Sequence, residues 1–139
     1  MPLDVVARVV ANKVESADSV LMFINDYVRH GDTNNLVWAI RGFCYKQGID
    51  VYTAMLEASI QYEDGCKKYG ERNWEKGQPL SWYINSGGRH YLKTGRGDKD
   101  EPHNRAFLWN MIGAIWTHEH KPELIDLPFA REIAGGEKV

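Results

Sequence analysis

Helical periodicity is the sequence feature that most limits the fold of this chain. Apolar residues recur three or four positions apart through most of the sequence, as in Val20, Phe23 and Ile24, and this spacing places them on one face of a helix. The alternating β-branched segments that are typical of strands are missing. The 139 residues fit one domain, so the pattern predicts an all-α fold, a compact single-domain bundle of about five to six helices.

Glycine, proline and aspartate residues divide this pattern into separate helices. We expect Asp50 to cap the helix that follows it, and Pro102 to occupy the first position of a later helix after a Glu101 or Asp100 cap. The expected helices cover residues 3–12, 17–30, 33–47, 51–68, 81–93 and 102–117.

The composition points to a soluble protein. Hydrophobic residues make up 43% of the chain and charged residues 26%, and no apolar run approaches the roughly 20 residues of a membrane span. The N-terminal sequence lacks a basic segment followed by an apolar block, so we expect a cytoplasmic protein. Cys44 and Cys66 fit neither a disulfide framework nor a zinc-ligand pair.

The basic residues are concentrated in one segment of an acidic chain. Residues 65–97 contain seven lysines and arginines but only two glutamates, whereas the whole chain has a net charge of −2. Duplex-binding proteins usually carry a basic excess over the whole domain, so we expect no duplex nucleic acid partner. The segment favours a small phosphorylated ligand, with an ordinary solvated basic face as the alternative.

Two pairs of polar residues have helical spacing. His103 and Asn110 are seven positions apart, as are Glu57 and Asp64, so each pair lies on one side of its helix. Carboxylates from two helices and a histidine could hold a hard divalent cation, which prefers oxygen ligands. The alternatives are a solvated helix face for the carboxylates and satisfied core groups for His103 and Asn110.

Two other motifs have simpler explanations. Gly87-Gly88 weakens a helix, and close approach of a neighbouring helix explains the pair more readily than room for a ligand. Adjacent residues on a helix point in different directions, so we expect His118-Glu119-His120 to be a surface feature and not a metal cluster.

A longer set of residues resembles a known family. The set contains, in order, Gly65-Cys66-Lys67-Lys68-Tyr69-Gly70, Asn73-Trp74, Gly77, Arg89-His90, Gly97, Asp100, His103 and Asn110. This order resembles the pattern of phage dATP/dGTP diphosphohydrolase-like proteins over about residues 57–122. The resemblance implies a fold related to the MazG-like nucleotide pyrophosphohydrolases, which split a nucleoside triphosphate between the α and β phosphates with Mg²⁺ held by helix carboxylates.

The resemblance also implies roles for individual residues. We expect Glu63, Asp100 and His103 to act in catalysis, and Glu63, Asp64 and Asp100 to hold Mg²⁺ or Mn²⁺. The expected ligand-binding residues are Lys68, Tyr69, Asn73, Trp74, Arg89, His90 and Asn110. The lysines and Arg89 would meet phosphates, while Tyr69 or Trp74 would stack on a base whose edge Asn73 could read. The alternative for these two rings is packing at the corner between the fourth and fifth helices.

The expected organisation has three regions. N-terminal helices in residues 1–50 would serve packing or oligomerisation, residues 51–121 would form a nucleotide-binding helical core, and residues 122–139 would form a C-terminal arm. The resemblance implies a phage protein that works in the host cytoplasm, and relatives of the MazG-like class associate, so we expect a homo-oligomer.

The matched region departs from the MazG-like pattern in one respect. It lacks the Glu-x-x-Glu and Glu-x-x-Asp pairs of those enzymes, since Glu15-x-x-Asp18 lies outside it. Two alternatives to an enzyme therefore stay open. One is a protein that captures a nucleotide or a nucleotide-derived immune signal without cleaving it, and the other is a purely structural helical protein.

Overall fold

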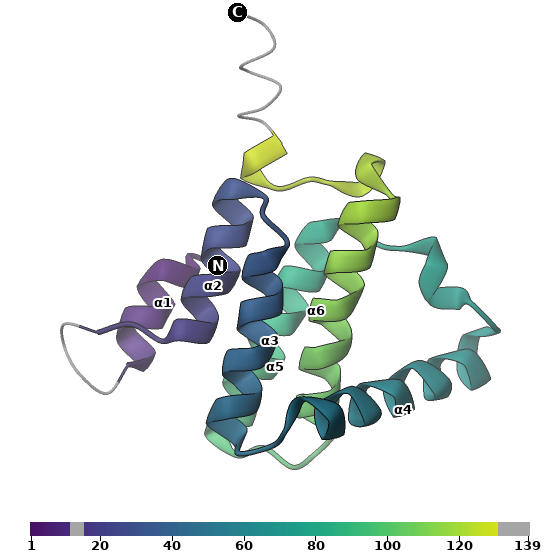
Figure 1. Ribbon diagram of the computed structural model, residues 1–139, viewed down its shortest axis with the longest axis horizontal. Coiled ribbons are helices and arrows are strands. Elements are labelled where there is room, and N and C mark those ends of the chain that lie inside the picture. The colour runs from purple at the N-terminus through teal and green to yellow at the C-terminus, as the bar shows by residue number, and fades with distance from the viewer. Residues whose placement is uncertain (12–15, 131–139) are drawn as a thin grey trace, which may run out of the picture.

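Two antiparallel helix pairs form the centre of the molecule. The computed structural model describes residues 1–11 and 16–130. One pair is α2 (Ser19–His30) with α3 (Asn34–Gln47), and the other is α5 (Leu80–Arg96) with α6 (His103–His120). The short helix α1 (Leu3–Val10) packs beside α2, on the side away from α6 (Figure 1). The described residues contain helices and no strand, which confirms the predicted all-α fold.

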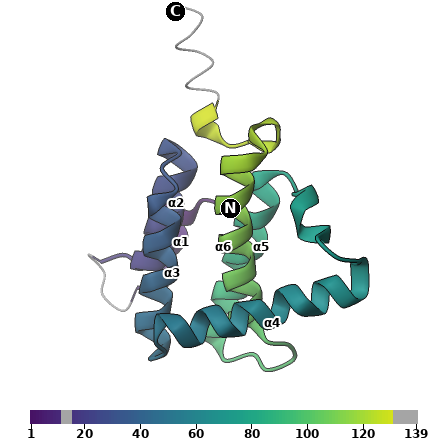
Figure 2. The ribbon, with the colours of Figure 1, turned by 45° about the vertical axis from the view of Figure 1, so that its right-hand side comes forward.

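The helix α4 (Val51–Tyr69) has a different direction from the two pairs. It runs across the N-terminal half of α6 and is followed by the 3₁₀ helix η1 (Asn73–Lys76), which leads the chain back to α5 (Figure 2). The guanidinium of Arg105 in α6 donates to the Glu57 carboxylate of α4 at 2.5 Å. This ion pair and the aromatic contacts described below fix α4 on α6.

Short-range signals account for most helix ends. The side chain of Asp50 accepts a hydrogen bond from the backbone N–H of Thr53 at 2.9 Å, which confirms the predicted cap of α4. Several expected helix ends were wrong by a few residues. The helix α2 begins at Ser19, α5 continues to Arg96 and α6 continues to His120. The helix α6 begins at His103, with Pro102 as its capping residue and no side-chain cap. None of the described helices is long and apolar enough to cross a membrane.

Two glycines allow α5 and α6 to approach closely. A Cβ atom at Gly87 would lie 2.5 Å from Cε of Met111, and one at Gly113 would lie 2.6 Å from the ring of Tyr83. Both glycines are buried in the interface of the two helices. The neighbour of Gly87 is the flexible end of a methionine and that of Gly113 is a buried ring, so Gly113 is the position where close packing limits side-chain size more strictly.

The beginning of the predicted C-terminal arm packs against the core. After the 3₁₀ helix η2 (Pro122–Leu124), Leu127 and Phe129 are buried, and the ring of Phe129 lies 5.5 Å from that of Tyr27. Nδ1 of His118 lies 2.9 Å from the Tyr27 hydroxyl, so the expectation that His118 is a surface feature was wrong. Residues 131–139 of the arm, like Glu15, lie outside the described residues.

Candidate functional site

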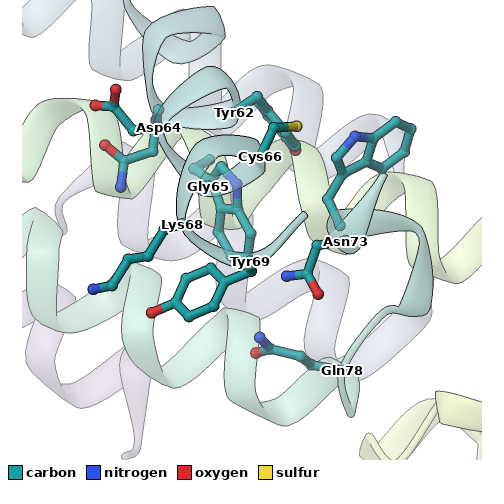
Figure 3. A pocket seen from close by; sticks show the side chains of 11 residues that line it. Tyr62, Asp64, Gly65, Cys66, Lys68, Tyr69, Asn73 and Gln78 are labelled. Carbon is teal, nitrogen blue, oxygen red and sulfur yellow. The ribbon is translucent and has the colours of Figure 1, made fainter. Parts of the chain in front are cut away.

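A pocket of about 400 Å³ lies where α4, η1 and α6 meet. We call it the aromatic pocket because Tyr62, Trp74 and Trp109 contribute to its wall. Five residues that the sequence analysis placed at a site also line this pocket: Asp64, Lys68, Tyr69, Asn73 and Trp74. Lys68 and Asp64 lie on one side of Tyr69, with Asn73 and Gln78 on the other side (Figure 3).

The aromatic residues of this pocket have two different surroundings. The ring of Trp74 packs edge-on against those of Tyr62, at 5.8 Å, and Trp116, at 5.1 Å, so it joins η1 to α4 and α6. Tyr69 is 61% exposed, and the ammonium group of Lys68 lies 5.2 Å from the centre of its ring. Tyr69 therefore offers a ring surface to a ligand, whereas Trp74 is held in the packing of the pocket wall.

A second pocket of about 500 Å³ lies between α5 and α6, and we call it the arginine pocket. Its lining includes three residues expected to bind a ligand: Arg89, His90 and Asn110. Gln61, Gln78 and Trp109 line both pockets. The two pockets are therefore adjacent, and together they form what we call the groove.

Arg89 is the main cationic group of the arginine pocket. Its side chain is exposed and makes no ion pair with a carboxylate of the described residues. The pocket also contains the side chains of Asn85 and Ser86, which lie one turn earlier on α5. Asn110 is held in place by its own Nδ2 group, which donates to the Ala106 carbonyl at 2.7 Å. A guanidinium without a protein partner can bind an anion.

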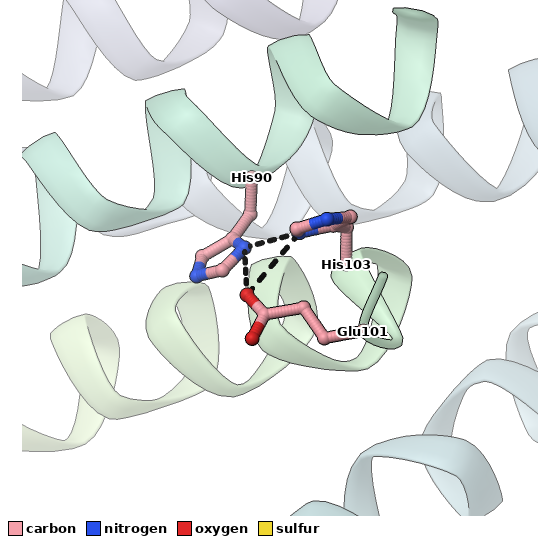
Figure 4. A group of neighbouring side chains, drawn as sticks. All are labelled: His90, Glu101 and His103. Carbon is pink, nitrogen blue, oxygen red and sulfur yellow. Dashed lines mark hydrogen bonds and ion pairs between the residues drawn. The ribbon is translucent and has the colours of Figure 1, made fainter. Parts of the chain in front are cut away.

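Two histidines meet beside the arginine pocket. Nδ1 of His90 lies 2.8 Å from Nδ1 of His103, and Nε2 of His103 donates to Oδ1 of Asp100 at 2.7 Å. The Glu101 carboxylate lies 3.6 Å from Nδ1 of His90 and 3.4 Å from Nδ1 of His103. Nε2 of His90 points away from the other two side chains (Figure 4).

The surroundings of this cluster set its charge. Burial lowers the pKa of His90, against the opposing effect of the Glu101 carboxylate, so His90 is neutral near pH 7. The hydrogen bond from His103 lowers the pKa of Asp100, so this carboxylate is ionised. The cluster therefore combines two imidazoles with two carboxylates.

The structure does not bring together the three carboxylates that were expected to hold a metal. Glu63 is exposed and lines neither part of the groove, Asp64 lines the aromatic pocket, and Asp100 lines a third pocket of about 560 Å³. Two groups of potential metal ligands exist among the described residues, and neither contains Glu63 or Asp64. Asp100 belongs to one of them, together with Asp98 and His103.

Three of the expected site residues, Arg89, His103 and Asn110, come together only in part. Arg89 and Asn110 line the same pocket, while His103 lines the third pocket and meets the groove through its contact with His90. Since the side chain of His103 is only 1% exposed, it can influence a ligand in the groove by positioning His90.

Sequence reasoning missed the residues that join the two pockets. Gln61 belongs to α4, Gln78 to the segment between η1 and α5, and Trp109 to α6. Two signals were present, because Gln61 lies one helical turn before the Gly65 motif and Trp109 precedes Asn110. Neither signal distinguishes a groove residue from a surface or core residue.

The fold and groove define a small all-α protein with aromatic rings in one part of its groove and, in the other, a guanidinium that pairs with no carboxylate of residues 1–11 and 16–130. A family model described as "dATP/dGTP diphosphohydrolase, N-terminal" matches residues 47–127. The match covers more than half of the chain, so this chain belongs to the dATP/dGTP diphosphohydrolase N-terminal family, which confirms the resemblance seen in the sequence. Neither the curated proteins nor the solved structures gave a match, and the relation to MazG-like enzymes stays a prediction.

Proposed function

We propose that this chain binds a purine deoxynucleoside triphosphate, dATP or dGTP, in the groove. We further propose that water cleaves it between the α and β phosphates, giving a deoxynucleoside monophosphate and pyrophosphate. Membership of the dATP/dGTP diphosphohydrolase family supports this reaction. The observation that carries the proposal is the groove itself, in which the exposed ring of Tyr69 and the exposed guanidinium of Arg89 lie in adjoining pockets.

The aromatic pocket suits the base. Stacking of a base on an aromatic side chain is worth about 1–3 kcal/mol and tolerates any base, so Tyr69 would supply affinity and little selectivity. The amides of Asn73 and Gln78 carry both donors and acceptors, and both line this pocket. These two side chains would read the edge of the purine.

The arginine pocket suits the triphosphate. A guanidinium can donate two parallel hydrogen bonds to phosphate oxygens, and such charge-assisted bonds are stronger than neutral ones. Arg89 has no carboxylate partner among the described residues, and Ser86 and Asn85 add polar groups in the same pocket. Gln61 and Gln78, at the junction of the two pockets, would face the sugar.

The remaining residues expected at the site fit this proposal unequally. Lys68, on the rim of the aromatic pocket, would reach the phosphates as a mobile cation. His103 and Asp100 would act as positioning residues, because His103 contacts His90, Asp100 contacts His103, and neither lines the groove. Glu63 lines neither part of the groove, so the proposal does not use it.

The three carboxylates expected to hold Mg²⁺ do not form a magnesium site. Mg²⁺ requires near-ideal octahedral oxygen ligands, and Glu63, Asp64 and Asp100 are not gathered in one place. The proposed reaction therefore involves no magnesium ion held by these three side chains. A requirement for Mg²⁺ or Mn²⁺ stays a prediction that the activity assay below tests.

One observation favours a second candidate, a protein that binds a nucleotide or a nucleotide-derived signal without cleaving it. Among the described residues, Asp64 supplies the one carboxylate that lines the groove. Cleavage of a triphosphate normally needs ions or bases that stabilise and deprotonate the attacking water, whereas capture needs only cationic and aromatic groups.

Incubation of the purified chain with dATP or dGTP separates these candidates. Mass spectrometry should find a deoxynucleoside monophosphate and pyrophosphate in equal amounts with Mg²⁺ or Mn²⁺, and neither product with EDTA. Binding without turnover under any of these conditions would replace the enzyme by the capture protein. Absence of both binding and turnover would reject both candidates.

A further inference from the structure

We propose that His90, Glu101 and His103 form a binding site for a divalent first-row transition-metal ion of the Zn²⁺ or Co²⁺ class. The three side chains come together at the junction of α5 and α6, where His90 extends from α5, His103 begins α6 and Glu101 lies in the loop before it (Figure 4). These three side chains alone form the site, which does not depend on the proposed nucleotide activity.

The ligand atoms have the spacing that a single ion requires. Nδ1 of His90, Nδ1 of His103 and Oε1 of Glu101 are separated by 2.8, 3.4 and 3.6 Å. Tetrahedral zinc has bonds of about 2.0–2.1 Å, which place neighbouring ligand atoms about 3.3 Å apart. The two distances to Glu101 match this value, and a small outward turn of one imidazole would bring the third to it.

The orientation of His103 prepares it to bind a cation. Its Nε2 atom donates to Asp100 at 2.7 Å, so in the neutral ring Nδ1 carries an electron pair, which accepts the hydrogen bond from Nδ1 of His90 when no ion is bound. An ion would take the place of this proton, which His90 can carry on Nε2 instead. Metal-binding histidines almost always donate their other N–H to a carboxylate or a carbonyl in this way. The side chain of His103 is 1% exposed, so its packing holds the ring in this orientation.

The chemistry of the three ligands selects the type of ion. Imidazole nitrogens suit Zn²⁺, Co²⁺ and similar ions, whereas Mg²⁺ and Ca²⁺ prefer oxygen. Glu101 contributes one negative charge directly, and Asp100 contributes a second through His103. Glu101 is 51% exposed, so an ion has access to the site and a further ligand can reach it from solvent.

A second group of side chains, on the other side of His103, is a weaker candidate for a metal site. Asp98, Asp100 and His103 also lie close enough to share an ion. The guanidinium of Arg96 already donates to both oxygens of Asp98, at 2.8 and 2.5 Å, and a cation there would compete with this ion pair. The site that contains Glu101 has no such competitor among the described residues.

Metal titration of the chain without a polyhistidine tag and without nucleotide tests this proposal. Calorimetry with Zn²⁺ and visible absorption with Co²⁺ should show one ion per chain. We expect Glu101→Gln, which keeps the shape of an exposed side chain, to weaken binding at least about tenfold, and Asp100→Asn to weaken it about 10–100-fold. Asp98→Asn, a matched change on the other side of His103, should bind like the unchanged protein.

Three results would overturn the proposal. The first is an unchanged chain that binds neither Zn²⁺ nor Co²⁺, which would leave His90 and His103 as a hydrogen-bonded pair. The second is Glu101→Gln with undiminished affinity. The third is a loss of binding in Asp98→Asn as large as in Glu101→Gln, which would place the ion on the other side of His103. Circular dichroism of each variant confirms that the measured chain is folded.

Discussion

The ammonium group of Lys46 lies 2.6 Å from the buried carboxylate of Asp18. The hydroxyl of Tyr91 donates to the same oxygen at 2.5 Å, and the backbone N–H of Leu21 donates to the other oxygen at 3.0 Å. Asp18 thereby caps α2 and connects it to α3, which carries Lys46, and to α5, which carries Tyr91. This carboxylate is a point where three helices meet.

We expect Asp18→Asn to destabilise the fold in a pH-dependent way. Burial alone would raise the pKa of Asp18, but the hydrogen bonds from Lys46, Tyr91 and Leu21 outweigh it and hold the pKa below its ordinary value. A lowered pKa means that the stabilisation is present above the unfolded pKa and is lost as the pH falls through the folded one. The variant should lose about 1–3 kcal/mol near pH 7, and this loss should shrink as the pH falls below 3.8, the ordinary pKa of aspartate.

Urea denaturation of the unchanged protein and of Asp18→Asn between pH 7 and pH 3 measures this difference in the free energy of unfolding. Asp26→Asn is the matched control, because Asp26 lies on the same helix α2 and pairs with no lysine or arginine of the described residues. A constant difference between the Asp18 variant and the unchanged protein across this range would contradict the role of the charge.

A second prediction concerns the contact between α5 and α6. A Cβ atom at Gly113 would lie 2.6 Å from the ring of Tyr83, which cannot move aside easily because it is buried. Overpacking costs about 1–3 kcal/mol, more than the roughly 1 kcal/mol gained by replacing a helical glycine with alanine. Gly113→Ala should therefore lower the melting temperature.

Gly95→Ala provides the comparison, because no atom lies within 4 Å of a Cβ at this exposed helical position. Its melting temperature should stay the same or rise. Equal shifts in the two variants would show that the close approach of Gly113 and Tyr83 does not limit side-chain size.

These contacts show which parts of the structure could be predicted from the sequence. The helices were predictable because their periodicity and caps, such as Asp50, act over a few residues. The groove was not, because Gln61, Gln78 and Trp109 come from separate elements that meet only after folding. Glu101 and His103 are close in the sequence, but their contact with His90 depends on the packing of α5 against α6.

A third prediction separates two aromatic residues that the sequence analysis treated alike. Tyr69→Ala should weaken dATP binding by about 1–3 kcal/mol, the value of one stacked base, with little change in the melting temperature because Tyr69 is 61% exposed. Trp74→Ala should lower the melting temperature, since its ring packs on Tyr62 and Trp116. Titration and thermal melts of both variants test this, and a large melt shift in Tyr69→Ala would count against a binding role.

A fourth prediction is that the chain forms a homo-oligomer. Large apolar side chains are exposed on α1 and α3, among them Val9 at 78%, Trp38 at 54% and Tyr45 at 88%, and a self-complementary apolar surface favours symmetric pairing. Light scattering should give a multiple of the 15.9 kDa chain mass, and Trp38→Glu should reduce it. The monomer mass for the unchanged chain at all concentrations would contradict this prediction.

The fifth prediction concerns Arg89, the cation assigned to the triphosphate. A lysine keeps the charge but cannot donate two parallel hydrogen bonds. Loss of a charge-assisted contact costs about 1.5–3 kcal/mol, so Arg89→Lys should weaken dATP binding at least about tenfold. Its melting temperature should change little, because Arg89 is exposed. Arg29→Lys is the matched control, since Arg29 is exposed on α2 and lines neither part of the groove.

Calorimetric titration of dATP into the unchanged protein, Arg89→Lys and Arg29→Lys is the most direct test of the groove as a nucleotide site. The account predicts one binding event per chain, lost or weakened at least about tenfold in Arg89→Lys and unchanged in Arg29→Lys. It would be contradicted if the unchanged protein bound neither dATP nor dGTP, or if Arg89→Lys bound dATP as tightly as the unchanged protein.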